Sequence, residues 1–232
     1  MESFVVIGTD TGVGKTAVCS FFARYLIENN QSVITQKWLQ SGSLAYSEDI
    51  SAHDELINVG RGFSGVDYSG FDDKRCSYCF RQPVTPYLAA KLENVVIDGE
   101  KIKDDFRFLE KHFSVVVVEG SGGALVQYQA KKYIVDLVKD LNLGVVLVAD
   151  NKLGAINHVL LTIEALEARG IKIMGLIFNQ VSVGVDSAVI KTNTELVLEA
   201  KKIRILADLP FNKNLEELYQ FFKREINKIS FI

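Results

Sequence analysis

The chain has 232 residues, of which 48% are hydrophobic and 24% are charged, and its formal net charge is −3 at pH 7. This length favours one α/β domain over residues 1–232, and the acidic balance argues against nucleic-acid binding. We expect no membrane partner and no signal peptide, because no apolar stretch is long enough to span a bilayer and no basic segment precedes one at the start. The three cysteines form no disulfide framework, so a reduced cytoplasm is the expected location.

Short runs rich in β-branched residues alternate with helical patterns along the chain. Strands are expected at residues 4–7, 33–37, 115–118, 145–149, 173–178 and 203–206. Helices are expected where apolar residues recur at helical spacing, at residues 18–26, 102–113, 134–141, 156–166 and 214–229. The Gly-rich residues 60–70 are expected to form a surface loop. The alternation predicts a single-domain, doubly wound, mainly parallel sheet with helices on both faces, a Rossmann-like α/β fold.

The segment GTDTGVGKT, residues 8–16, lies between the first expected strand and the first expected helix. It ends like a phosphate-binding loop, but Gly8 lies one residue further from Gly14 than the usual spacing allows. In such a loop Lys15 would reach the outer phosphates and the Thr16 hydroxyl would bind Mg²⁺. A glycine-rich turn without a ligand is the alternative. The strand and helix on either side favour a nucleotide site in a P-loop NTPase fold, with contacts from Gly12, Val13, Gly14, Lys15, Thr16 and Ala17.

Polar residues that follow expected strands are candidate ligand contacts, because ligands of such sheets bind at the carboxyl ends of the strands. Glu119 follows the apolar run 115–118, where a carboxylate would bind the Mg²⁺ of a nucleotide. A carboxylate that faces solvent is the alternative. Lys37 ends the strand 33–37, and Ser41 lies just beyond it. This lysine could face the γ-phosphate or an anionic substrate, or it could be an ordinary solvated lysine.

A second metal ligand is expected among the acidic residues that follow Ser41. Asp54 is the candidate, and Asp49 and Glu55 are nearby competitors. A metal held this way would use oxygen ligands alone, as Mg²⁺ prefers.

Two segments bear on which base the nucleotide carries. Residues 151–154 (NKLG) resemble the start of a guanine-reading Asn-Lys-x-Asp motif, but Gly154 occupies the place of the aspartate. Asn179, at the end of the strand 173–178, offers both a donor and an acceptor, which suits adenine. ATP is therefore the expected nucleotide.

With these residues placed, the chain resembles the dethiobiotin synthetase family. The matching strings are GTDTGVGKT, KWLQSG, QPVTPYLAA, VEGSGGALV, LGAINHVLLT and GLIFNQV, which are spread over most of the chain. The loop with one extra residue is then the family's own variant of the phosphate loop. LGAINHVLLT and KWLQSG are more specific to the family than the loop and VEGSGG, which wider ATPase relatives share. Gly12, Trp38, Ser121 and the long segment 60–79 depart from the family pattern.

The resemblance implies an ATP-dependent ligase of biotin biosynthesis, which converts 7,8-diaminopelargonic acid, CO₂ and ATP into dethiobiotin, ADP and phosphate. One amine takes up CO₂ as a carbamate, the carbamate attacks the γ-phosphate, and the second amine closes the ring and expels phosphate. Catalytic roles are implied for Thr11, Lys15, Lys37 and Ser41. The two lysines would offset charge on the transferring phosphoryl and the carbamate, and Thr11 and Ser41 would hydrogen-bond the diamine-carbamate end.

The resemblance also implies a metal site, substrate contacts and a homodimer. Mg²⁺ would be held by Thr16, Asp54 and Glu119. Besides Ser41, the backbone groups of Gly122, Gly123 and Ala124 would contact the substrate. In the family the site is completed across a two-fold interface, and Asn157 matches the residue that reaches in from the partner.

Two rival functions share the fold. Regulatory ATPases of the ParA/MinD kind carry a signature lysine at the place of Asp10, which argues against that class. Ligases related to the cobyrinic acid amidating enzymes normally carry a glutaminase domain, for which this chain has no room. Whether ATP turnover requires a diamine or a protein partner separates these functions.

Two further patterns have competing interpretations. Cys76 and Cys79 form a Cys-x-x-Cys pair that could be half of a zinc site or a redox pair, but no second pair is present. Residues 214–229 form an amphipathic pattern, with Asn214 and Glu217 as a possible capping box. Such a helix can anchor a protein to a membrane, but more often it packs on its own domain.

Overall fold

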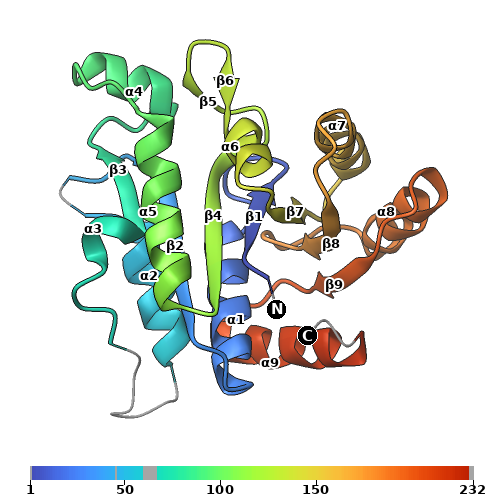
Figure 1. The fold of residues 1–232 in the computed structure, drawn as a ribbon. Coiled ribbons are helices and arrows are strands. Elements are labelled where there is room, and N and C mark those ends of the chain that lie inside the picture. The colour runs from blue at the N-terminus through green and yellow to red at the C-terminus, as the bar shows by residue number, and fades with distance from the viewer. Residues whose placement is uncertain (1, 45, 60–66, 230–232) are drawn as a thin grey trace.

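The computed structural model describes residues 2–44, 46–59 and 67–229. The strands in these ranges are β1 Phe4–Gly8, β2 Val33–Ser41, β3 Cys76–Phe80, β4 Val115–Gly123, β5 Gln127–Gln129, β6 Lys132–Tyr133, β7 Gly144–Asp150, β8 Ile173–Asn179 and β9 Ile205–Leu209. One sheet has the order β3-β2-β4-β1-β7-β8-β9, and each neighbouring pair is parallel. The antiparallel hairpin of β5 and β6 lies beyond the carboxyl end of β4 (Figure 1).

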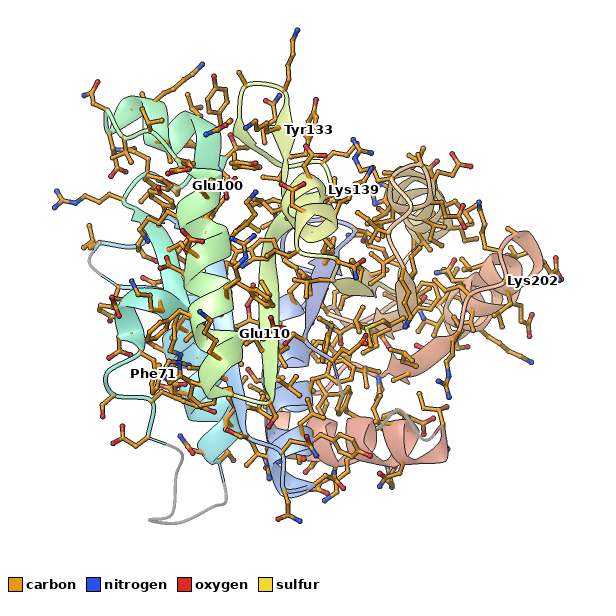
Figure 2. All side chains as sticks on the ribbon, in the orientation of Figure 1. Phe71, Glu100, Glu110, Tyr133, Lys139 and Lys202 are labelled. Carbon is orange, nitrogen blue, oxygen red and sulfur yellow. The ribbon has the colours of Figure 1, made fainter. Side chains whose placement is uncertain are left out.

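Helices cover both faces of this sheet (Figure 1), and their side chains are drawn in the same orientation in Figure 2. The described helices are α1 Lys15–Glu28, α2 Glu48–Asn58, α3 Asp72–Arg75, α4 Pro86–Leu92, α5 Gly99–His112, α6 Ile134–Asp140, α7 Ala155–Glu167, α8 Ser187–Ala200 and α9 Leu215–Lys228. The apolar residues of α1, α2 and α9 form one core with one face of the sheet. Those of α5, α6 and α7 form the other core with the opposite face.

The central strands contribute side chains to both cores. In β1, Phe4 and Val6 lie in the core with α1, while Val5 and Ile7 lie in the core with α5. All four are at most 1% exposed. This two-sided burial explains the uninterrupted apolar sequence of such strands, because alternate side chains point to opposite faces of a sheet.

The predicted fold class is confirmed, and all six expected strands are present. The sequence analysis missed β3, the β5–β6 hairpin and the helices α2, α3, α4 and α8. In the longest of these elements, α8, the apolar pattern is weak because only Asn193 and Val197 are buried among its described side chains. The predicted surface loop at residues 60–70 lies mostly outside the described residues, and residues 67–70 form no helix or strand.

The C-terminal helix α9 packs against the domain. Tyr219 and Phe222 are fully buried, and Phe222 lies edge-on to Phe22 of α1 with ring centroids 4.9 Å apart. The side chain of Asn214 caps the helix by accepting from the backbone N–H groups of Glu216 and Glu217. Glu217 bonds the Asn214 side chain rather than its backbone, so the expected capping box is incomplete. No helix in the described ranges is both long and apolar enough to cross a membrane.

Candidate active site

The phosphate loop joins β1 to α1, and two of its positions require glycine. A Cβ atom on Gly8 would lie 2.7 Å from the carbonyl oxygen of Asp10 and 2.8 Å from a methyl carbon of Val13. A Cβ atom on Gly14 would collide with the amide nitrogen of Asn179, and Gly14 has a φ of +94°, which L residues rarely adopt. The close contacts at Gly8 and Gly14 therefore leave no room for a side chain at either position.

Lys15 is the first residue of α1 and lies folded back over the loop. Its ammonium donates to the carbonyl oxygen of Asp10 at 2.9 Å. Burial, and after it the charge of Lys37, lowers the pKa of Lys15 below its ordinary value. No side chain of the described residues caps α1, so the N–H groups of its first turn remain open to an anion.

The carboxyl ends of β2 and β4 bring Lys37 and Glu119 together beside this loop. Lys37 Nζ lies 2.6 Å from Glu119 Oε1 and 2.7 Å from Asp49 Oδ2. The Thr16 hydroxyl lies within hydrogen-bonding distance of two acceptors, Glu119 Oε1 at 3.3 Å and Asp49 Oδ1 at 3.4 Å. The other oxygen of the carboxylate, Glu119 Oε2, lies 2.9 Å from Nε2 of His53. Lys37 and Glu119 are only 5% and 2% exposed. The alternatives in which Lys37 is an ordinary solvated lysine and Glu119 faces solvent are therefore wrong.

The predicted metal ligand Asp54 does not join this cluster. Its two carboxylate oxygens are bound by the guanidinium of Arg75, at 2.6 and 2.8 Å. Asp49, the competitor on the same helix, occupies the position beside Thr16 instead. Successive residues of a helix are rotated by about 100°, so a residue five positions along points about 140° away from the first. The phase of α2, which the sequence pattern did not reveal, therefore decides which carboxylate faces the loop.

Mutual stabilisation keeps the buried pair of Lys37 and Glu119 ionised. Burial alone would raise the pKa of Glu119, but the charge of Lys37 and the hydrogen bond from His53 outweigh it and lower the pKa to about 2. Burial likewise opposes the charged form of Lys37, but Glu119 and Asp49 raise its pKa above the ordinary value. The site thus presents one fixed cation between two carboxylates at neutral pH.

The donor atoms beside the loop suit Mg²⁺. Thr16, Asp49 and Glu119 supply one hydroxyl and two carboxylates, the hard oxygen ligands that this ion takes. Cys19, His53 and Glu119 also place possible ligand atoms within 4.8 Å of one another. Burial, and after it the nearby charge of Glu119, raises the pKa of the Cys19 thiol well above its ordinary value. A protonated thiol is a poor ligand, so the oxygen set is the better metal site.

A cavity of about 680 Å³ opens beside the loop and gathers most of the predicted site residues. Its lining includes Thr11, Gly12, Gly14, Lys15, Thr16, Lys37, Ser41, Asp49, Glu119 and Gly122. Residues 83–86 of the QPVTPYLAA motif also line the cavity, and Leu39 and Val126 add apolar lining. One cavity is therefore lined both by the polar groups of the phosphate loop and by apolar side chains.

The remaining predicted residues lie outside the cavity lining. These are Val13, Ala17, Asp54, Gly123, Ala124, Asn157 and Asn179. Asn157 lies exposed on α7. Asn179 donates one of its amide hydrogens to the carbonyl oxygen of Val13 at 2.9 Å and so ties β8 to the phosphate loop. Its second hydrogen and its oxygen have no bond within the described residues, and its role in reading adenine stays a prediction.

The sequence analysis missed His53 and gave Asp49 only as a competitor. The signal that could have found both is their spacing of four residues, which places two side chains on one face of a helix. Trp38, a departure from the family pattern, is fully buried and donates to the side-chain oxygen of Gln36 at 3.0 Å. Cys76 and Cys79 are free thiols in β3 and join no cluster of metal ligands among the described residues.

Comparison with known proteins decides the family. The AAA domain profile matches residues 2–218. The ATP-dependent dethiobiotin synthetase BioD of Fusobacterium nucleatum is 40% identical over 77% of this chain and 78% of the relative. That of Halalkalibacterium halodurans is 32% identical over 93% of this chain and 87% of the relative. The chain belongs to the dethiobiotin synthetase family. The resemblance drawn from the motifs is confirmed.

Two solved structures share the fold of this dethiobiotin synthetase family member. The MinD cell division protein of Aquifex aeolicus gives a TM-score of 0.60 over 99% of this chain and 97% of its own. A ParA family ATPase from Chlorobium tepidum gives 0.55 over 98% of this chain and 93% of its own. Both are 14% identical to this chain. At that identity the likeness shows the fold alone.

Proposed function

We propose that this protein is an ATP-dependent ligase that carboxylates 7,8-diaminopelargonic acid with CO₂ and closes the ring to dethiobiotin, releasing ADP and phosphate. One observation carries the proposal. The phosphate loop, the cluster of Lys37, Asp49 and Glu119, and the segment 83–86 line one cavity in a chain that belongs to the dethiobiotin synthetase family. Such a cavity can hold the outer phosphates of ATP and a small anionic substrate side by side.

In the proposed reaction one amine of the substrate adds to CO₂ and loses a proton, which gives a carbamate. A carbamate oxygen attacks the γ-phosphorus and ADP leaves. The second amine then attacks the carbonyl carbon of the mixed anhydride, the C–O bond to phosphate breaks, and a proton is released as the cyclic urea forms. The protein holds the reactants in line and offsets their negative charge, because phosphoryl transfer needs little covalent help.

Lys37 is suited to be a fixed positive charge in this reaction rather than a base. Its two carboxylate partners raise its pKa, so the ammonium stays protonated at neutral pH. Lys15 has one contact to a backbone carbonyl, which a phosphate oxygen can replace. The hydroxyls of Thr11 and Ser41 border the same cavity and can orient the carbamate.

Mg²⁺ is the metal we propose, held by Thr16, Asp49 and Glu119. The ion, when bound, would neutralise charge on the phosphate oxygens of ATP. Asp49 replaces Asp54 in this assignment because of its contact with Thr16.

We further propose a homodimer in which α7 of each subunit lies near the site of the other. Asn157 is exposed on this helix, and Leu153 and Leu161 beside it are 85% and 58% exposed. Leu161 lies on α7 and Leu153 lies two residues before its start, and neighbouring exposed leucines of this kind are typical of an interface rather than of a free surface.

Mass spectrometry of the purified protein with Mg-ATP, bicarbonate and 7,8-diaminopelargonic acid tests the reaction. The expected result is a cyclic urea product together with ADP release that requires the diamine. ATP hydrolysis that proceeds equally well without the diamine would contradict the ligase and favour a regulatory ATPase.

A further inference from the structure

The carboxylate of Glu119 is shared between two different environments. Its Oε1 atom faces Lys37 and Thr16, on the side of the phosphate loop. Its Oε2 atom lies 2.9 Å from His53 Nε2, on the side of α2. Glu119 is 2% exposed and His53 is fully buried, so no solvent molecule can take the place of the imidazole without a change of structure.

Helix α2 presents His53 and Asp49 to the cluster together. The two residues lie four positions apart and therefore on one face of the helix. Ser47 caps this helix by accepting from Ile50 N at 3.2 Å, and its hydroxyl donates to Gln40 Oε1 at 2.9 Å. The cap joins the start of α2 to β2, so the rotational position of both side chains is held relative to the sheet.

The hydrogen-bonding partners define the direction of the bond between His53 and Glu119. Glu119 is ion-paired with the Lys37 ammonium at 2.6 Å, so its carboxylate oxygens are acceptors and the imidazole donates through Nε2–H. His53 Nδ1 is buried without a partner among the described residues.

We propose that His53 is a positioning residue for the metal site. By donating to Oε2 it holds the carboxylate in one orientation, with Oε1 directed at Thr16. In this orientation only one carboxylate oxygen contacts the Lys37 ammonium. Without this donor the carboxylate can turn both oxygens toward Lys37, and the Mg²⁺-nucleotide loses a correctly directed ligand. The inference rests on the proposed function for the identity of the metal, and no described contact of His53 reaches the cavity itself.

The test compares three variants by direct metal binding. His53→Leu removes the donor at similar volume, whereas His53→Gln restores an amide N–H four bonds from Cα, as far as Nε2 of histidine. Ile57→Ala is the matched control, because it weakens the packing of the same helix one turn further on without touching Glu119. Binding of Mn²⁺ in the presence of ADP is measured by electron paramagnetic resonance, and thermal melting confirms that each variant is folded.

We expect Mn²⁺ to bind His53→Leu roughly 10- to 100-fold more weakly than the wild type, since groups that orient metal ligands typically contribute that much. His53→Gln and Ile57→Ala should stay within about threefold of the wild type. Equal binding by the wild type and His53→Leu would overturn the proposal, as would the same loss in Ile57→Ala or no recovery in folded His53→Gln. Metal binding needs no diamine, so failure of the ligase reaction in the wild type would be seen separately.

Discussion

The buried cation Lys37 offers a quantitative test of the site, through the replacement Lys37→Met. The pKa of Glu119 is about 2 in the folded protein, against an ordinary value of 4.5. At about 1.4 kcal/mol per pKa unit, this difference corresponds to roughly 3 kcal/mol of stability at neutral pH. Burial opposes this shift, and the charge of Lys37 is the largest contribution in its favour. We therefore expect Lys37→Met to lower the free energy of unfolding by about 3 kcal/mol, in the range typical of a broken buried ion pair.

The loss of stability in Lys37→Met should depend on pH in a definite direction. A carboxylate with a depressed pKa stabilises the fold above the unfolded pKa, and this stabilisation is lost as the pH falls toward the folded value. In Lys37→Met, burial favours the protonated form of Glu119. Lowering the pH protonates this carboxylate and so reduces the destabilisation of the variant. The difference in the free energy of unfolding between wild type and variant should therefore decrease by about 1 kcal/mol or more as the pH falls from 7 to 4.

Urea unfolding in EDTA, followed by the fluorescence of the single tryptophan, measures both effects. Trp38 is fully buried and next to Lys37 in the chain, so its emission reports on this strand. Lys37→Met/Glu119→Gln removes both charges and should recover much of the lost stability. Lys191→Met, at an exposed lysine, is the control and should change stability little. A loss below about 1 kcal/mol in Lys37→Met, or no recovery in the double variant, would refute the reasoning.

Three further predictions concern activity and assembly. Asp49→Asn should weaken Mg²⁺ activation of ATP turnover by about tenfold or more, while Asp54→Asn, whose partner is Arg75, should lower thermal stability and leave Mg²⁺ activation nearly unchanged. Lys15→Ala should lower kcat for product formation by roughly 10²–10³-fold with an unchanged melting temperature, and near-normal turnover would contradict its assignment. Leu161→Glu should shift the protein from dimer to monomer in light scattering; an unchanged mass would place the interface elsewhere.

Local patterns were sufficient for the central part of the fold. The strands around β1 are buried on both faces, so their sequences are apolar throughout and can be recognised without knowing their partners. The elements that were missed lie at the periphery. β3 is one of the two edge strands of the sheet and has no β-branched residue, and α2 buries only Ile50, His53 and Ile57 among its described side chains. Elements that bury few side chains show little apolar periodicity in their sequences, so they are hard to recognise.

The phosphate loop, the strand and helix on either side of it, and the family could all be recognised from the sequence. Each of these depends on residues close together in the chain, where spacing and residue type suffice. The packing of α2 was needed to choose between Asp49 and Asp54 and to bring His53 into contact with Glu119. These contacts join residues 21 to 66 positions apart and depend on the rotational position of the helix. The local sequence offers only the four-residue spacing of Asp49 and His53, because the partners of these side chains are set by how α2 packs against the sheet.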